Sequence, residues 1–130
     1  MRFRKVTGDG PKYWSILGEI SRPYNVVALK MGDPVYVTEG ELDAEVGTQI
    51  GLTTIGFPGA HLWKPVFARL FRFRRVFVLQ DGDDAGEQFG ETLCKDIPGA
   101  KPIDMGVGRD LNSIFLDHGA DYLKEWIGYE

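Results

Sequence analysis

The amino-acid sequence predicts an α/β fold with a mainly parallel four-stranded sheet and helices on both of its faces. Short apolar and β-branched runs alternate with segments of helical period, and the connections between them are short. Such alternation is typical of parallel strands joined by right-handed crossovers. In addition, residues 76–79 (VFVL) are apolar throughout, as expected for a strand that is covered on both faces.

The first half of this pattern contains two strands and two helices. Residues 35–38 (VYVT) are β-branched and aromatic between two turn signals, and residues 53–55 (TTI) have a similar composition. Residues 41–50 place apolar side chains four positions apart and end before a glycine, which predicts a short helix. A second helix is expected over residues 61–71, with Pro65 in or near its first turn. The residues expected on its apolar face are Leu62, Val66, Phe67 and Leu70.

The second half repeats the alternation. The strand at 76–79 is expected at the centre of the sheet, and a helix over 84–96 follows it. The side chains that this helix turns inward are expected to be Phe89, Leu93 and Ile97. A last strand is predicted at 101–105, and one or two helical stretches interrupted at Gly119 are predicted across 111–127.

Length and composition limit the class of protein. A chain of 130 residues has the length of about one domain, and 43% hydrophobic residues are sufficient for its core. One cysteine and two histidines exclude a disulfide framework and a zinc site built from two cysteine pairs. No apolar stretch approaches the ~20 residues that cross a bilayer, and no signal-peptide pattern is present. We therefore expect an intracellular protein with no membrane partner.

The net charge of −4 conceals a block pattern. Residues 1–32 carry six Lys/Arg and two Asp/Glu, and residues 33–63 carry only five acids. Residues 64–75 carry five Lys/Arg and no acid, and residues 76–130 carry four Lys/Arg and twelve acids. Solvated faces of opposite sign would explain such blocks, so the positions of the acids decide their meaning.

Acids follow three of the predicted strands. Glu39 and Asp43 come after the first strand, Asp81 and Asp83 after the third, and Asp110 after the fourth. Ligands of open parallel sheets bind at the carboxyl ends of the strands, where the strand order reverses. Carboxylates gathered there repel one another unless they take up protons or bind a cation, and hard oxygen ligands point to Mg²⁺ or Mn²⁺. The pattern predicts a divalent-metal site suited to phosphoryl or nucleotidyl transfer.

The acidic string at 81–86 (DGDDAG) has simpler explanations. Asp83 or Asp84 can cap the following helix and complement its dipole, and we favour the cap as the role of Asp84. A calcium loop is excluded, because its fifth position would be Ala85 and its twelfth Thr92, where a glutamate is needed.

Three strings together resemble the motifs of the Toprim domain, the metal-binding domain of bacterial-type primases, phage primase-helicases, some topoisomerases and some nucleases. They are residues 37–43 (VTEGELD), 81–86 (DGDDAG) and 109–112 (RDLN), and they are most similar to the versions in primases. Upstream, residues 11–13 (PKY) resemble a segment that precedes Toprim in primases. The resemblance implies a Toprim domain over 33–130, after a short irregular segment, 1–32, that is similar to the end of a primase polymerase subdomain.

The resemblance also implies roles for single residues. Glu39 corresponds to the catalytic glutamate, a metal ligand or acid/base at the 3′ oxygen, and Asp43 to a supporting catalytic acid. Asp81 and Asp83 correspond to the principal metal ligands with catalytic roles, and Asp110 completes a second metal position. Asn112 stands where cellular primases have an aspartate, and its role is left open. Two Mg²⁺ ions, with Mn²⁺ as a substitute, are the implied cofactors.

Basic residues are expected to bind phosphates beside these metals. Lys12, Lys64 and Arg109 are the candidates for nucleotide or nucleic-acid phosphate. The basic residues Arg69, Arg72, Arg74 and Arg75 could add to them or could form a solvated helix end.

The resemblance predicts the catalytic part of a DNA primase, which makes RNA primers from nucleoside triphosphates on single-stranded DNA in the cytoplasm of a bacterial or phage-infected cell. The chain contains no zinc ribbon and no Walker loop, so a companion primase subunit or helicase, or another part of a longer parent, is expected to supply the rest. A small metal-dependent Toprim nuclease and a noncatalytic DNA-binding or scaffold module are the alternatives.

Overall fold

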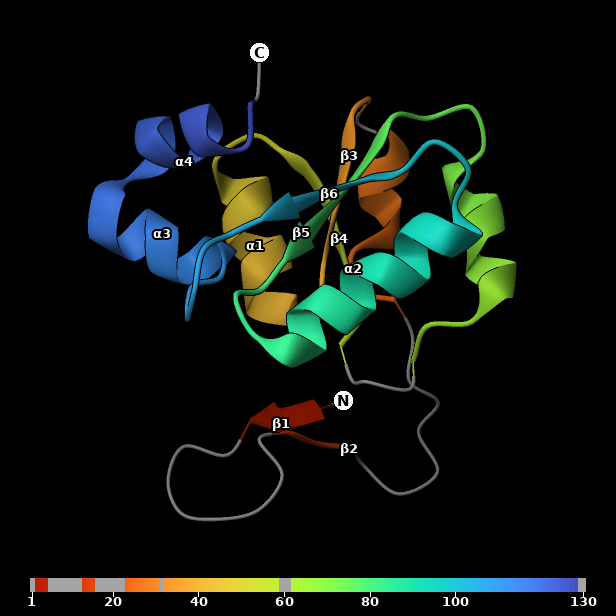
Figure 1. Ribbon diagram of the computed structural model, residues 1–130, viewed down its shortest axis with the longest axis horizontal. Helices are drawn as coiled ribbons and strands as arrows, with labels where there is room; N and C mark the ends of the chain where they lie inside the picture. Colours follow the sequence, from red (N-terminus) through yellow and green to blue (C-terminus); the bar gives the residue numbers. More distant parts are fainter. Residues whose placement is uncertain (1, 5–12, 16–22, 31, 59–61, 129–130) are drawn as a thin grey trace.

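The computed structural model describes residues 2–4, 13–15, 23–30, 32–58 and 62–128 (Figure 1). Its strands are β1 (Arg2–Arg4), β2 (Tyr13–Ser15), β3 (Val35–Thr38), β4 (Thr53–Gly56), β5 (Val76–Gln80) and β6 (Lys101–Asp104). Its α-helices are α1 (Glu41–Gln49), α2 (Asp84–Asp96), α3 (Leu111–His118) and α4 (Ala120–Trp126). Two 3₁₀ helices complete the described part, η1 (Val26–Lys30) and η2 (Pro65–Phe71).

Four of the strands form one parallel sheet in the order β4-β3-β5-β6. Val35 of β3 pairs with Thr53 of β4 on one side and with Val76 of β5 on the other. The chain therefore passes from β3 to β4, then crosses back to β5 on the opposite side of β3. The strand order reverses between β3 and β5, and the predicted α/β fold with a parallel four-stranded sheet is confirmed.

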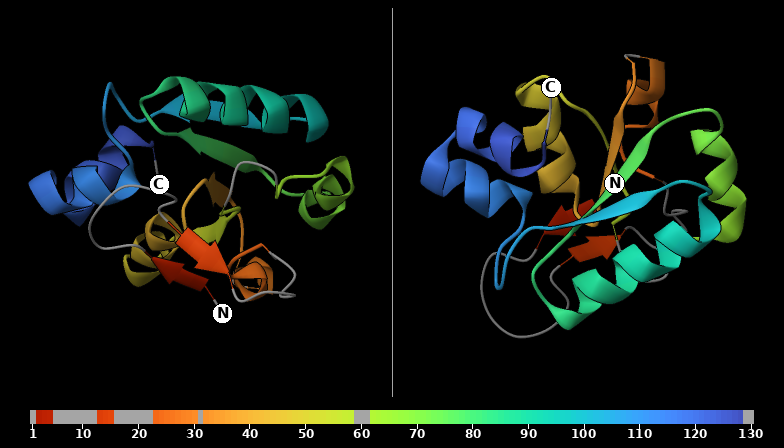
Figure 2. Two further views of the ribbon diagram at one scale, coloured as in Figure 1. Left: turned by 90° about the horizontal axis from the view of Figure 1, so that it is seen from below. Right: turned by 45° about the horizontal axis from the view of Figure 1, so that its top comes forward.

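Apolar side chains cover both faces of the sheet, because adjacent residues of a strand point to opposite sides. Val35 and Val37 of β3 belong to a buried cluster with residues of η2 and α2, whereas Tyr36 belongs to a second cluster with residues of α1, α3 and α4. The views in Figure 2 show α2 and α1 on opposite sides of the sheet. All four residues of β3 are buried, as expected for an interior strand.

The helix predicted over 61–71 differs from expectation. Residue 61 lies outside the described residues, and Pro65–Phe71 form a 3₁₀ helix, not an α-helix. With three residues per turn, Phe67 and Leu70 lie one above the other and are partly buried, whereas Val66 turns outward and is 55% exposed. The prediction that Val66 is on the buried face is wrong because it assumed a period of 3.6 residues.

The N-terminal part contains more regular structure than the sequence suggested. β1 and β2 pair antiparallel, with Arg2 opposite Ser15. Tyr24 forms an antiparallel bridge with Gly56 of β4 through two backbone hydrogen bonds of 2.7 and 3.0 Å. The Asn25 side-chain amide donates to the carbonyl oxygen of Thr54 at 2.9 Å. Residues 23–30 thus cover the edge of β4 and contact the sheet across the predicted boundary at residue 32.

Among the described residues, no helix combines the length and the apolar character that crossing a membrane requires.

Candidate metal centre

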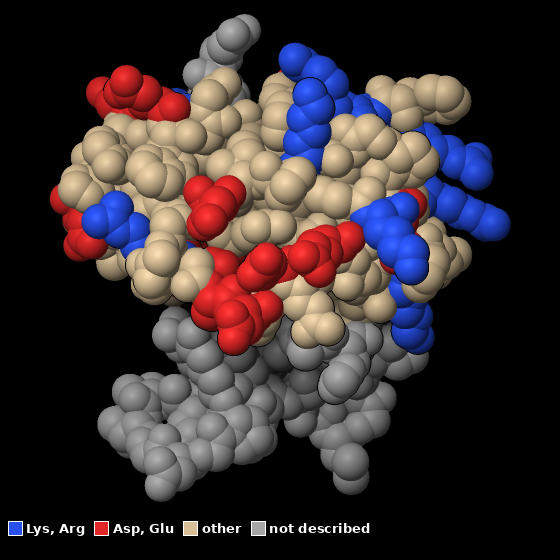
Figure 3. Space-filling view, in the orientation of Figure 1, with Lys and Arg blue, Asp and Glu red and all other residues tan. Residues whose placement is uncertain are grey.

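Acidic side chains gather at the edge of the sheet where the strands end. Glu39 directly follows β3, and Asp43 lies in the first turn of α1. Asp81 directly follows β5, and Asp110 is the N-cap residue of α3. Because β3 and β5 are neighbours at the point where the strand order reverses, the turns after them meet at one site. Figure 3 shows acidic side chains along the first part of α2, whereas basic side chains gather toward η2 and the end of α2.

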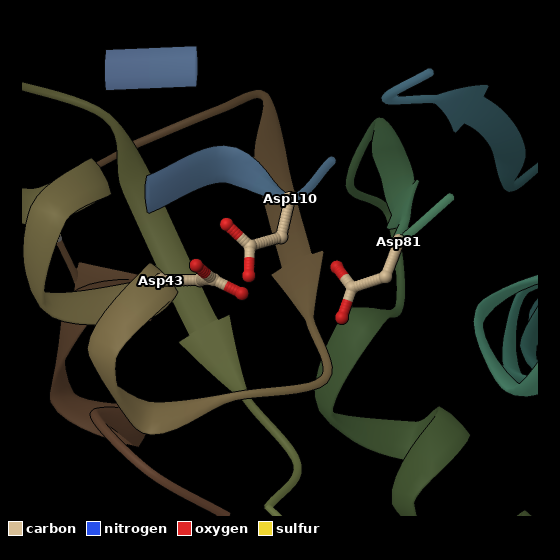
Figure 4. Close-up of side chains that lie close together, drawn as sticks. All are labelled: Asp43, Asp81 and Asp110. Atoms are coloured by element: carbon tan, nitrogen blue, oxygen red, sulfur yellow. The ribbon is translucent and has the colours of Figure 1, made fainter. Parts of the chain in front are cut away.

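Within the described part of the chain, Asp43, Asp81 and Asp110 form a cluster of three carboxylates, which we call the aspartate triad (Figure 4). One carboxylate oxygen from each residue lies within 4.8 Å of the other two. Asp43 is only 5% exposed, and the other two are half-buried. The sequence predicted Asp81 and Asp110 as metal ligands but gave Asp43 only a supporting catalytic role. The position of Asp43 in the first turn of the helix after β3 is the sequence signal that could have identified it as a metal ligand.

The N-terminus of α3 holds two members of the triad. The backbone N–H of Asn112 donates to Oδ1 of Asp43 at 3.0 Å, across 69 positions of sequence. Asp110 accepts from the backbone N–H of Ser113 at 2.8 Å, and the Ser113 hydroxyl oxygen accepts from the backbone N–H of Asp110 at 2.9 Å. This capping box fixes Asp110 while its other carboxylate oxygen can still bind a cation. The sequence offered no signal for the role of the Asn112 backbone.

The loops after β5 and β6 interlock through their backbones. The N–H of Gly82 donates to the carbonyl oxygen of Arg109, and the N–H of Gly108 donates to the carbonyl oxygen of Gly82, both at 2.8 Å. A Cβ at Gly82 would collide with the carbonyl oxygen of Gly106. This close approach sets the position of Asp81 relative to Asp110. In the sequence, the glycines at 82, 106 and 108 are the signal for this close approach.

Gly82→Ala is therefore expected to separate the two loops. Because the atoms it meets are backbone atoms, which cannot rotate away, we expect a loss of about 3 kcal/mol in the free energy of unfolding and weaker metal binding. Gly40→Ala is the control for stability, because a Cβ there meets nothing closer than Oδ2 of Asp43 at 3.4 Å. Chemical denaturation compares the stability of the two variants, and Mn²⁺ titration compares metal binding by Gly82→Ala with that of the wild type. Equal stability of the two variants would show that the interlock is not what positions Asp81.

The proximity of the acids changes their protonation. Burial raises the pKa of Asp81 to about 8, with further contributions from the charges of Asp43, Glu39 and Asp110 and from a hydrogen bond with Glu39. Burial also raises the pKa of Glu39, the hydrogen bond with Asp81 opposes this, and the Asp83 charge adds to it. In the absence of a cation, Glu39 and Asp81 therefore hold a proton between them near neutral pH. A divalent cation would displace that proton.

Asp83 and Asp84 do not join the triad. Asp83 is the N-cap of α2, with extended backbone angles, and its Oδ1 accepts from the backbone N–H of Gly86 at 2.6 Å. Asp84 is already the first residue of the helix, so the prediction that Asp84 provides the cap is wrong. Asp83 still lines a cavity of about 380 Å³ beside Asp81. The other residues around this cavity include Asp84, Glu87, Asp104 and Val107.

The predicted phosphate-binding cations are dispersed. Arg109 immediately precedes Asp110 at the acidic edge, as the sequence suggested. Lys64 follows Trp63, whose indole N–H donates to Asp96 at 2.8 Å, at the end of α2 remote from the triad. Lys12 lies outside the described residues.

The fold resembles that of several solved primase structures. The TM-score is 0.75 to a DnaG catalytic core, 0.76 to a DNA primase domain from Pseudomonas aeruginosa and 0.71 to the RNA polymerase domain of Mycobacterium tuberculosis primase DnaG. The sequence identities are 19%, 19% and 18%, and the matches cover 96%, 99% and 98% of this chain. They cover 46%, 46% and 49% of those chains, so this chain spans about half of each. The similarity shows that the chain has the Toprim-like fold of primase domains.

No protein-family model matches the sequence. A curated protein of Mycobacterium phage D29, the Gene 57 protein, is 40% identical over 129 residues. That match covers 98% of this chain and 85% of the phage protein. The chain therefore belongs to the same family as the Gene 57 protein of this phage.

Proposed function

We propose that this chain is the catalytic Toprim part of a DNA primase, which joins nucleotides into RNA primers in a metal-dependent reaction. The aspartate triad carries the proposal, because it lies at the reversal point of a sheet with the fold of primase domains. This is the position where open α/β sheets bind their ligands.

The donor set of the triad suits magnesium. All three ligands are carboxylate oxygens, with no nitrogen or sulfur that would favour zinc. Oxygens bound to one Mg²⁺ ion lie at most about 4.2 Å apart, because each Mg–O distance is about 2.1 Å. The 4.8 Å limit of the triad is slightly wider. The carboxylates are therefore close enough for side-chain rotation to bring them around one ion or a pair of ions.

The residues of the site divide the work. Asp43, Asp81 and Asp110 would hold the metal, which when bound polarises phosphoryl oxygens and makes a 3′ hydroxyl more acidic. Glu39 lies in contact with Asp81, and its raised pKa suits it to accept the proton of the 3′ hydroxyl. Asp83 lines the adjacent cavity, where it would serve as a further metal ligand. Arg109 would attract a nucleotide phosphate. Lys12 remains a candidate phosphate contact from the sequence alone.

The proposal includes a partner. The chain spans about half of the primase chains that it resembles, so template binding is assigned to another part of a longer parent or to a companion primase subunit or helicase. Single-stranded DNA and nucleoside triphosphates are the proposed substrates. The proposed cofactors are two Mg²⁺ ions, with Mn²⁺ as a substitute.

A template-directed labelling assay tests the activity. The whole chain is incubated with single-stranded DNA, nucleoside triphosphates including one radiolabelled, and Mn²⁺. We expect short labelled products, mainly dinucleotides, that disappear in EDTA and in Asp81→Asn. Asp117→Asn, the same change on an exposed acid of α3, should retain the activity. Full-length primers made by the chain alone would contradict the need for a partner.

The same reaction distinguishes the nuclease alternative when the DNA carries a second label. Metal-dependent cleavage of the DNA without incorporation of nucleotides would replace the primase proposal with a Toprim nuclease. Metal binding with neither reaction would favour the noncatalytic module.

A further inference from the structure

A basic loop lies at the end of the sheet opposite to the triad. Residues 72–75 (RFRR) connect η2 to β5 and precede Val76, whereas Asp81 follows the other end of β5 (Figure 1). Five residues of strand at about 3.3 Å each separate the loop from Asp81 by roughly 17 Å. Of the two alternatives for these arginines, phosphate binding directly beside Asp81 is therefore disfavoured, and a solvated surface remote from the triad is favoured.

Phe73 projects from this loop. Its side chain is fully exposed, and its backbone has φ = 62°, in the left-handed region that glycine favours. The residues after it are anchored: Arg74 donates to the carbonyl oxygen of Leu29 at 2.8 Å, and Arg75 donates to Asp33 through its backbone N–H at 2.7 Å and through Nε at 2.8 Å. A strained aromatic residue on an anchored loop is typical of a contact site.

A cavity lies beside the phenylalanine. Its volume is about 560 Å³. It is lined by the loop 72–75 together with Ala68, Phe71, Ile97 and Pro98. Arg72 and Arg69 are exposed nearby, and residues 64–75 contain five cations and no acid. Figure 3 shows basic side chains gathered on the side of η2 and of the end of α2, where the acidic band along α2 ends next to them.

We infer that this loop is a second binding surface for single-stranded nucleic acid, in which a base stacks on Phe73 and the phosphates contact Arg72 and Arg69. An exposed aromatic ring beside cations is the combination that binds unpaired bases and their backbone. A polyanion complements the charge of this segment, which is why nucleic acid is favoured over a protein partner. The inference goes beyond the proposed function, because this binding requires no metal and no reaction.

Fluorescence anisotropy in EDTA tests the surface independently of catalysis. The probe is a fluorescein-labelled, mixed-sequence, single-stranded 20-nucleotide DNA, titrated with the whole chain. We expect Phe73→Ala and Phe73→Leu to weaken binding about tenfold, since both lose the stacking ring, and Phe73→Trp to retain it. Arg72→Ala should lower the slope of log affinity against log salt by about 0.7, the value for one phosphate contact to a single strand. Lys124→Ala, the same charge change on α4, should leave that slope unchanged.

Phe73→Gly separates binding from folding. Glycine relieves the left-handed backbone, so this variant should melt a few degrees higher than the wild type and still bind DNA about tenfold more weakly. Wild-type affinity of Phe73→Ala or Phe73→Leu would overturn the inference and would instead favour a protein partner at this loop. Because the titration contains EDTA, a failed activity assay leaves this result unaffected, and a failure here leaves the proposed reaction untouched.

Discussion

Asp81→Asn is expected to unfold at a higher temperature than the wild type in EDTA at pH 8.5. The folded pKa of Asp81, about 8, lies above its ordinary value of 3.8, so the folded state binds the proton more tightly than the unfolded state. The stability that this group contributes is complete below about pH 4 and is lost as the pH rises through 8. Asparagine carries no charge at any of these pH values, so the variant should not show this loss.

The expected difference is large for one substitution. A pKa shift of this size corresponds to several kcal/mol in the free energy of unfolding. Because the half-buried side chain contacts solvent, we expect a difference of about 2 kcal/mol. For a domain of 130 residues this is a difference of about 7 °C in Tm. Thermal melts from pH 4 to 9 measure it, with Asp117→Asn as the exposed control. A variant less stable than the wild type at pH 8.5 would mean that the triad is not a source of repulsion.

Divalent metal should stabilise the wild type, with the largest effect at high pH. Binding at 100 times Kd raises the free energy of unfolding by about 2.7 kcal/mol, or the Tm by about 10 °C. The effect should diminish below pH 8, because the cation then competes with the proton on Asp81. Asp43→Asn and Asp110→Asn should lose most of this metal-dependent increase in Tm. Their amide oxygens can still accept the N–H groups of Asn112 and Ser113, so the fold is expected to persist.

Asp83→Asn is the variant that separates two roles in the same melts. Asparagine caps helices as well as aspartate does, so the metal-free Tm should remain near that of the wild type. If Mn²⁺ raises the Tm of this variant less than that of the wild type, Asp83 is a metal ligand, in agreement with its resemblance to the motif. If the increase in Tm equals that of the wild type, Asp83 serves only as the helix cap. If Mn²⁺ leaves the Tm of the wild type unchanged at pH 8.5, the proposed metal site is contradicted.

The sequence predicted the elements whose signals are local. The apolar run at residues 76–79 of β5 and the alternation around it are sufficient to indicate a parallel sheet with two covered faces. The helix at Pro65–Phe71 was misjudged, because a run of apolar residues does not distinguish a period of 3.0 from one of 3.6 over seven residues. The cap of α2 was placed one residue late, since adjacent aspartates are equally suited to that role.

The sequence by itself determined that acids follow three strands of a parallel sheet and that basic residues form a separate block. Only the tertiary structure decided which acids meet. It brings Asp43 to Asp81 and Asp110, and it commits the Asp83 side chain to the start of α2. It also places the arginines of 72–75 at the opposite end of β5. The physical reason is that strand order, loop packing and backbone contacts such as Asn112 to Asp43 join residues far apart in the chain. No local pattern of residue types encodes such contacts.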